Sequence, residues 1–346
     1  KLKINMSGKH VVILKNDAVG DLVHSLQAIN NIVYSSDVEK ITIFVSKLSY
    51  KFDFLFAATK VKVKVLNYNL SLVDRINLFF FILSNKIEKI YILTPKNYYY
   101  YLPVFFYKTK FYAICVNNIN NYKRPPAFLR KFLYKYVIND RSVQFKRIST
   151  SKLQLELTNN INSKNNQKKI NADISEKLKR YLPNNYIYFH VKRKILNELG
   201  WGIKELKILF NEFLKYSDHV VITKDIELDD NTLIFKENFT SLDFNSSKFI
   251  DNKKKIIFFD NIDGKDLYNT ILHSNKVVAF HGMMTNIASI NKQKVLDLFH
   301  CNIRDWNDYR NYRNSFYEFK PNYDGYNFII PNKDINKTIK KIRRFL

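Results

Sequence analysis

The chain has 346 residues, of which 46% are hydrophobic, and its 57 basic and 31 acidic side chains give a net charge of +26. This length suits two domains, and the apolar content excludes a disordered or fibrous protein. No stretch approaches the roughly 20 apolar residues that cross a bilayer. Two cysteines are too few for a disulfide framework or a structural zinc site. No signal-peptide pattern opens the sequence, so we expect a cytoplasmic location.

The positive charge is concentrated in the first half of the chain. Residues 1–150 hold 24 basic and 8 acidic side chains, and residues 96–147 hold 11 basic residues against Asp140 alone. Such a field indicates an anionic partner, whether nucleic acid, anionic lipid or a phosphorylated substrate. Compositional drift is a second explanation, because Asn, Ile, Lys, Tyr and Phe are abundant while Gly and Pro are scarce.

Strand-like and helix-like patterns alternate through the first 117 residues. Short apolar or alternating runs predict strands at 11–14, 39–46, 61–68, 89–94 and 111–116. Apolar residues at helical spacing predict helices at 22–32, 47–58 and 70–84. Strands and helices that alternate at this spacing form βαβ units in a parallel sheet.

The segment 125–137 has the pattern of a basic amphipathic helix. Two prolines open it, apolar residues follow at helical spacing, and Arg130, Lys131 and Lys135 occupy the other face. One interpretation is a helix packed on the core with solvated lysines. The other is a membrane-facing surface that rests on anionic lipid, with aromatic side chains at the headgroup level.

The second half repeats the first pattern after a polar linker over 151–184, in which 153–158 is a candidate strand. Further strands are predicted at 186–191, 219–223, 256–260, 276–280 and 294–299, with helices at 204–216, 266–274 and 285–291. We therefore predict an α/β fold of two Rossmann-like domains facing across a cleft. They cover 1–150 and 185–330, and a basic helix over 331–346 follows.

Asp21 lies where the strand at 11–14 passes through a turn into a helix. Ligands of open α/β sheets bind beyond the carboxyl ends of the strands. One interpretation makes Asp21 an N-cap, with a pKa kept low by the helix dipole. The other makes it a general base for an acceptor hydroxyl. His24 lies on the same helix face, where it contacts Asp21 or a ligand, or packs in the core.

A second candidate site follows the strand at 276–280, where residues 281–286 lead into a helix. Backbone N–H groups at a helix N-terminus bind phosphate, and Thr285 and Asn286 add side-chain hydrogen bonds. The alternative is an ordinary connection capped by Thr285. The chain has neither a Gly-x-Gly-x-x-Gly nor a Walker pattern, which argues against dinucleotide or P-loop chemistry.

Two stretches together, KNDAVGDLVHSLQAI at 15–29 and ILHSNKVVAFHGMMTNIASINKQKVLDLFH at 271–300, resemble the heptosyltransferase-like glycosyltransferases of family nine, which have the GT-B fold. That family carries a Gly-Asp before a His in its first βα unit. Its second signature places an acidic residue, a hydroxyl residue and a histidine where this chain has His281, Gly282 and Asn286.

The resemblance implies a role for particular residues of each domain. Asp21 would be the catalytic base of the acceptor-side domain, together with Lys15, Asn16 and His24. The C-terminal domain would bind the nucleotide sugar through residues that cluster after two of its strands: Lys192, Arg193, His281, Gly282, Met283, Met284, Thr285 and Asn286.

The implied activity is inverting, metal-independent transfer of a sugar from a nucleotide-diphosphate donor, with no cofactor. The acceptor would be a hydroxyl of an anionic, lipid-linked or lipopolysaccharide-type bacterial glycan, and the enzyme would be peripheral on the inner face of the cell membrane. No Asp-x-Asp occurs to hold a metal-bound diphosphate. Two alternatives are an inactive GT-B scaffold and a basic nucleic-acid-binding protein. We expect no nucleic-acid partner, because no signature of such a module is present.

Overall fold

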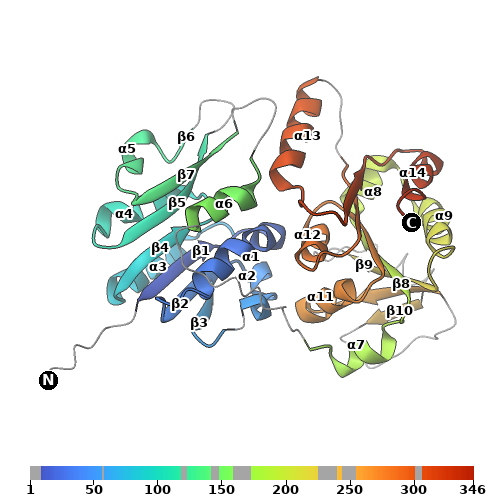
Figure 1. Ribbon diagram of the computed structural model, residues 1–346, viewed down its shortest axis with the longest axis horizontal. Helices are drawn as coiled ribbons and strands as arrows, with labels where there is room; N and C mark the ends of the chain where they lie inside the picture. The colour runs from blue at the N-terminus through green and yellow to red at the C-terminus, as the bar shows by residue number, and fades with distance from the viewer. Residues whose placement is uncertain are drawn as a thin grey trace. The chain divides into compact units, whose positions relative to one another are not determined.

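The computed structural model describes residues 9–56, 58–117, 123–141, 148–158, 173–224, 240–243, 255–300 and 306–346. The chain divides into two compact units, shown in Figure 1: unit 1 comprises residues 1–170 with 309–320, and unit 2 comprises 171–308 with 321–346. The assignment of 309–320 to unit 1 differs from the predicted span of the C-terminal domain. Residues 159–172 of the predicted linker lie outside the described residues.

Unit 1 is built on a seven-stranded sheet with the order β3-β2-β1-β4-β5-β6, in which β7 also pairs with β5. Its strands are β1 (His10–Lys15), β2 (Lys40–Val45), β3 (Val61–Val65), β4 (Ile87–Ile92), β5 (Lys110–Asn117), β6 (Lys123–Arg124) and β7 (Lys135–Asp140). Among the described residues, the strand pairs of this sheet are parallel except β5 with β6, which is antiparallel. The predicted parallel sheet is confirmed.

The helices of unit 1 connect and cover these strands. They are α1 (Val19–Val33), α2 (Lys47–Tyr50), η1 (Asp53–Phe56), α3 (Leu72–Ser84), η2 (Asn97–Tyr100), α4 (Leu102–Phe105), α5 (Ala127–Arg130), α6 (Thr150–Thr158) and, from residue 309 on, α13 (Trp306–Phe319). Leu78, Leu102 and Leu129, from α3, α4 and α5, share one core cluster with Leu14. These three helices therefore cover the same face of the sheet.

Two predictions for the 125–158 region are wrong. The segment 125–137 forms only the four-residue α5 before the chain enters β7, so no amphipathic helix exists there. The Arg130 Nη2 donates to Asn117 Oδ1 at 3.0 Å, and the Lys135 Nζ donates to the Glu156 carbonyl at 2.9 Å, so these cations share no helix face. Residues 153–158 belong to helix α6 rather than to a strand.

The predicted helix over 47–58 is divided into two short helices, α2 and η1.

Unit 2 is built on a second seven-stranded sheet, with the order β10-β11-β9-β8-β12-β13-β14 and parallel pairing throughout. Its strands are β8 (Tyr186–Val191), β9 (His219–Lys224), β10 (Thr240–Asp243), β11 (Ile256–Asp260), β12 (Lys276–Phe280), β13 (Val295–Leu298) and β14 (Tyr326–Ile329). The helices are α7 (Glu176–Tyr181), α8 (Arg193–Leu199), α9 (Ile203–Phe213), α11 (Gly264–Leu272), α12 (Met283–Ile290) and α14 (Ile335–Ile342). The predicted α/β fold with two parallel-sheet domains is thus confirmed.

Aromatic packing fixes the central strands of unit 2. The Phe189 ring of β8 lies 5.4 Å from the Phe210 ring and 5.9 Å from the Phe280 ring, centre to centre. These rings are fully buried in one core cluster. Large aromatic side chains contribute strongly to the stability of a core, and these three join β8 and β12 to α9. No helix in the described part of the chain combines the length and apolar character needed to cross a membrane.

Candidate active site

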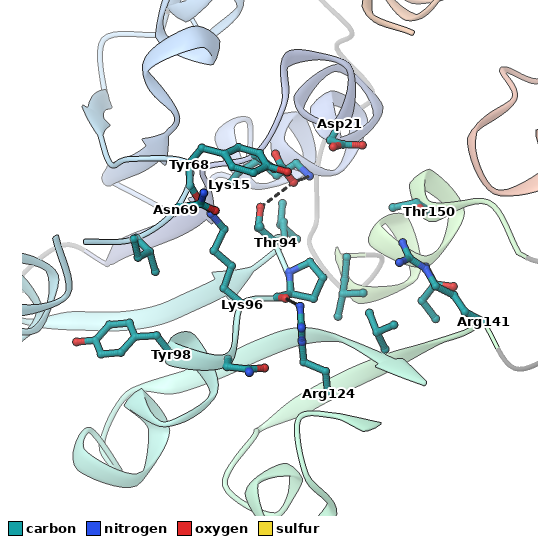
Figure 2. Close-up of a pocket in the computed structure, with 18 of the residues that line it drawn as sticks. Lys15, Asp21, Tyr68, Asn69, Thr94, Lys96, Tyr98, Arg124, Arg141 and Thr150 are labelled. Carbon is teal, nitrogen blue, oxygen red and sulfur yellow. Dashed lines mark hydrogen bonds and ion pairs between the residues drawn. The ribbon is translucent and has the colours of Figure 1, made fainter. Parts of the chain in front are cut away.

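A cavity of about 520 Å³ opens at the carboxyl edge of the unit 1 sheet, and Figure 2 shows it. All the residues that line it belong to unit 1. Seven of its polar side chains stand at the ends of three strands: Lys15, Asp17 and Asp21 at the end of β1, Thr94 and Lys96 after β4, and Asn139 and Arg141 around the end of β7. This edge is where parallel α/β sheets bind their ligands.

Asp17 connects several segments of the chain at the cavity. Its Oδ2 lies 2.6 Å from the buried Lys15 Nζ and accepts a hydrogen bond of 2.8 Å from the Thr94 hydroxyl. Its backbone carbonyl accepts from the hydroxyls of Ser46 and Ser49. Asp17 Oδ1 is buried without a hydrogen bond to any described residue. Sequence reasoning did not single out this residue, although it stands two positions beyond a strand end.

Asp21 lies in the first turn of α1, three positions after the N-cap residue Ala18, so the N-cap interpretation is wrong. Burial raises the pKa of its carboxyl, and the charge of Lys15 lowers that pKa less than burial raises it. The low pKa expected from the helix dipole is therefore wrong too. The carboxylate makes no hydrogen bond to the described side chains, and in Figure 2 it borders the cavity. A desolvated carboxylate of raised pKa is a competent proton acceptor.

Five cations line the cavity: Lys15 and Arg141 are paired with the carboxylates of Asp17 and Glu318, and the other three contact backbone carbonyls or aromatic rings. Lys96 Nζ donates to the carbonyls of Asn16 and Tyr68 and lies 4.8 Å from the centre of the Tyr68 ring. The Arg124 Nη1 donates to the Pro95 carbonyl at 3.0 Å. The basic lining residues are Lys15, Arg75, Lys96, Arg124 and Arg141, against the two acids Asp17 and Asp21. This excess of positive charge favours an anionic ligand.

The charge of Lys96 is expected to make anion binding in this cavity dependent on pH. Burial lowers the pKa of its ammonium to about 8. Its positive charge is therefore present below that pH and lost as the pH rises through it. Sulfate keeps its charge over this range, so its affinity, measured by calorimetry, should fall several-fold between pH 7 and pH 9. The Lys96→Met variant should show a flat profile, and the exposed-site control Lys62→Met should behave as the unmodified chain. If the sulfate affinity of the unmodified chain did not change between pH 7 and pH 9, Lys96 would not be the group that makes binding depend on pH.

Glu318 of α13 anchors one wall of the cavity. Its carboxylate is fully buried, and its Oε1 accepts from Arg141 Nη2 at 2.6 Å and from Asn139 Nδ2 at 2.9 Å. The next residue, Phe319, lines the cavity. Nothing in the sequence reasoning singled out α13, because its residues show no clear apolar stripe.

The three residues predicted on the acceptor side have different surroundings. Lys15 lines the cavity, whereas Asn16 and His24 do not. The Asn16 side chain donates to the Asn67 carbonyl at 2.7 Å and accepts from the Tyr99 hydroxyl at 2.6 Å, so it braces the loops behind the cavity. The His24 ring lies 5.8 Å from the Phe319 ring, centre to centre.

In unit 2, the predicted donor-binding loop surrounds Gly282, the N-cap of α12. Its φ of 147° is a backbone conformation that side-chain-bearing residues rarely adopt, and a Cβ here would overlap the Lys192 amine. The Lys192 Nζ donates to the His281 carbonyl at 2.5 Å. The structure thus places a lysine amine beside the N-terminus of α12. Met284, Thr285 and Asn286 are buried, whereas Arg193 is exposed.

The His281 ring is oriented by a buried carboxylate that sequence reasoning missed. His281 Nδ1 lies 2.6 Å from Asp297 Oδ2, which also accepts from the Tyr326 hydroxyl at 2.7 Å. A carboxylate at this distance holds the proton on Nδ1 and leaves Nε2 for another partner. Asp297 is fully buried. Among the described residues, no three or more His, Cys, Asp or Glu side chains are grouped to hold a metal ion.

Neither a family model nor a curated protein sequence matches the chain. Solved structures do match it. E. coli ADP-heptose lipopolysaccharide heptosyltransferase II superposes with a TM-score of 0.63 at 10% identity, over 97% of this chain and 98% of that one. E. coli heptosyltransferase WaaC with ADP-2-deoxy-2-fluoro heptose gives 0.62 at 9% identity, over 97% and 98%. A family nine glycosyl transferase from Veillonella parvula DSM 2008 gives 0.62 at 11% identity, over 97% and 89%. The chain therefore has the fold of these glycosyltransferases, as the resemblance implied.

Proposed function

We propose that the chain is a glycosyltransferase that moves a sugar from a nucleotide-diphosphate donor to a hydroxyl of an anionic, lipid-linked or lipopolysaccharide-type glycan. The observation that carries the proposal is Asp21, a partly buried carboxyl of raised pKa at the border of a cationic cavity. The match in fold to two heptosyltransferases supports the same reaction class. Unit 1 would hold the acceptor and unit 2 the donor.

In the proposed reaction Asp21 accepts the proton of the acceptor hydroxyl as the hydroxyl oxygen attacks the anomeric carbon of the donor sugar. The bond from that carbon to the diphosphate oxygen breaks, and the nucleoside diphosphate leaves with its electron pair. A single displacement of this kind inverts the configuration at that carbon. Arg141 and Lys96 would attract anionic groups of the acceptor into the cavity and orient the hydroxyl toward Asp21. Lys15 would keep part of the negative charge on the carboxyl, because its ammonium opposes the effect of burial on the pKa.

The donor diphosphate would bind at the start of α12. The Lys192 amine and the backbone N–H groups of residues 283–285 can neutralise phosphate charge without a metal ion. His281, held by Asp297 through Nδ1, would donate or accept at Nε2. The heptosyltransferase WaaC match contains an ADP-linked sugar analogue, which supports a nucleotide sugar as the donor class.

The first experiment is calorimetry of the full chain with ADP, UDP, GDP and CDP, followed by transfer from the matching nucleotide sugars to lipopolysaccharide. We expect one nucleotide to bind with micromolar affinity and its sugar to be transferred equally well with and without EDTA. The Lys192→Ala variant should bind that nucleotide about tenfold more weakly, because it loses a charge-assisted hydrogen bond to phosphate. The neighbouring exposed lysine gives a matched control, Lys194→Ala, with unchanged affinity.

Three results would contradict the proposal. The first is binding of none of the four nucleotides. The second is salt-sensitive binding to oligonucleotides of any sequence, which would indicate a nucleic-acid-binding protein. The third is epimerisation of the donor sugar without transfer.

A further inference from the structure

Helix α3 of unit 1 exposes apolar side chains on the face that should meet water. Only Leu78 and Ile82 of its 13 residues are buried. Leu72, Phe80 and Leu83 are 70%, 59% and 62% exposed, and Val73 and Ile76 are exposed beside them. A surface helix normally presents polar residues on its outer face. This one is apolar on both faces, so its outer face is a candidate contact surface.

The apolar surface continues onto the segment that contains α4. The Phe79 ring of α3 lies 5.8 Å from the Phe105 ring and 4.9 Å from the Phe106 ring, centre to centre. Phe105 is 64% exposed and Tyr107 is 79% exposed, with Tyr101 and Val104 exposed nearby. Figure 1 shows α3 and α4 as parts of the same unit, and one core cluster beneath them places both on one face of its sheet. We name the exposed apolar side chains of these two segments the α3–α4 surface.

Lysines stand at the edge of the α3–α4 surface. A groove of about 520 Å³ brings Leu83, Phe105 and Tyr107 together with the exposed ammonium groups of Lys86 and Lys108. The Lys108 Nζ lies 5.9 Å from the centre of the Tyr107 ring. The two nearby acids are already engaged: Asp74 caps α3 through Ser71, and Glu88 lies 3.7 Å from the Lys89 amine.

We propose that the α3–α4 surface docks on an anionic lipid bilayer. Exposed Leu and Phe side chains would enter the boundary between headgroups and acyl chains. Phe105, Tyr101 and Tyr107 would lie at the headgroup level, where aromatic side chains concentrate. Lys86 and Lys108 would contact and attract anionic headgroups. The protein would lie on the membrane rather than cross it.

The charge of the chain favours a bilayer over a second copy as the occupant. A two-fold contact through this surface would bring the lysines of both copies toward one another in a protein whose net charge is +26. An anionic bilayer removes that repulsion.

The α3–α4 surface also begins beside the cavity, since Arg75 of α3 lines the cavity one helical turn from Leu72. A membrane-bound acceptor would thus have its polar group near Asp21 and its lipid near α3.

The test is flotation of the full chain with phosphatidylcholine vesicles that contain or lack phosphatidylglycerol. We expect binding only to the anionic vesicles. The Phe80→Gln/Leu83→Gln pair should weaken binding about a hundredfold, because two large apolar side chains no longer enter the lipid. The Lys86→Gln/Lys108→Gln pair should weaken it about tenfold or more. All four positions are exposed, so the folding of the variants should be unaffected, as thermal melts would verify.

Matched controls come from α2 and the residue after it, which expose one aliphatic, one aromatic and two lysine side chains elsewhere on unit 1. The Leu48→Gln/Tyr50→Gln and Lys47→Gln/Lys51→Gln pairs remove equal numbers of apolar and charged groups, and both should bind as the unmodified chain does. Equal loss in the controls, unchanged binding of the test variants, or a dimer that only the Phe80/Leu83 pair abolishes would each overturn the proposal. The assay uses no nucleotide or acceptor, so its failure is distinguishable from failure of the proposed glycosyltransferase activity.

Discussion

Replacing Asp21 with asparagine is expected to lower kcat for sugar transfer by about a thousandfold, within the range that general-base catalysis contributes. The asparagine amide has the size of the carboxyl but cannot accept the acceptor's proton. Affinity for the donor nucleotide should be unchanged, because the residues proposed to bind it, Lys192 and the start of α12, lie in unit 2. Stopped-time transfer assays and calorimetry on the same preparation would measure the two quantities.

The pH dependence provides a second check on the same residue. Burial raises the pKa of the Asp21 carboxyl. As the pH falls, the unmodified enzyme should therefore lose activity at a pH above the usual pKa of an aspartate. The stability effect has the opposite sign from that of a salt-bridged acid. A raised folded-state pKa means that the folded chain binds more protons, so this group's contribution to stability falls as the pH rises through that pKa. Asp21→Asn should therefore melt at the same or a slightly higher temperature at neutral pH.

The matched control is Asp53→Asn, which changes an exposed carboxylate at the start of the short helix η1. It should keep full activity, because Asp53 does not line the cavity. Transfer by Asp21→Asn at the rate of the unmodified chain would reject Asp21 as the base. Equal loss of activity in both variants would instead indicate a general effect of removing negative charge.

Much of the sheet architecture could be predicted because strand and helix periods change sharply along the chain. The run Val11 to Leu14 is buried on both faces, and the following helix buries Leu22, Leu26 and Ile29 at helical spacing. These patterns are local, so a single sequence contains them. The same reasoning recovered β8, β9, β11, β12 and β13 of unit 2.

The wrong predictions fall on segments whose apolar residues fit both the strand period and the helix period. In LQLELT the leucines alternate as in a strand, yet Leu153 and Leu157 are also four residues apart and are buried on one side of α6. In 125–137 the helical spacing of the apolar residues is real, but Lys135–Asp140 has a stronger partner in β5, with which it forms six register pairs. Tertiary contacts decided both cases, the packing of α6 against α1 and the pairing of β7 with β5, and the local pattern does not contain them.

The cavity could be predicted only in part, for a related reason. Asp21 was found from the pattern of the first strand and the helix after it, and Lys15, the last residue of that strand, was implied by the family resemblance. Lys96 follows β4, Arg124 belongs to β6 and Arg141 follows β7, and only the pairing of these strands around β5 brings them together. The helix that completes the wall reaches unit 1 after the chain has passed through most of unit 2. Its anchor is a glutamate, a residue type that ordinarily indicates solvent exposure.

That anchor leads to the largest expected effect on stability. Replacing Glu318 with alanine should destabilise unit 1 by about 3 kcal/mol, because it leaves the buried Asn139 amide and one side of the Arg141 guanidinium without their acceptor. Glu318→Gln keeps one oxygen acceptor but not the charge, so it should lose less. Thermal unfolding and the rate of proteolytic cleavage within 306–319 would measure both changes.

Glu156→Ala provides the control, because Glu156 is an exposed glutamate on α6 of the same unit whose carboxylate forms no hydrogen bond or ion pair with the described residues. Its effect on the free energy of unfolding should stay within about 0.5 kcal/mol.

Loss of the Glu318 charge should also lower the pKa of Asp21, because Arg141 would be free to approach the Asp21 carboxylate. The acid limb of the activity profile should then move to lower pH in Glu318→Gln. A profile that does not move would show that Glu318 holds α13 in place without adjusting the base.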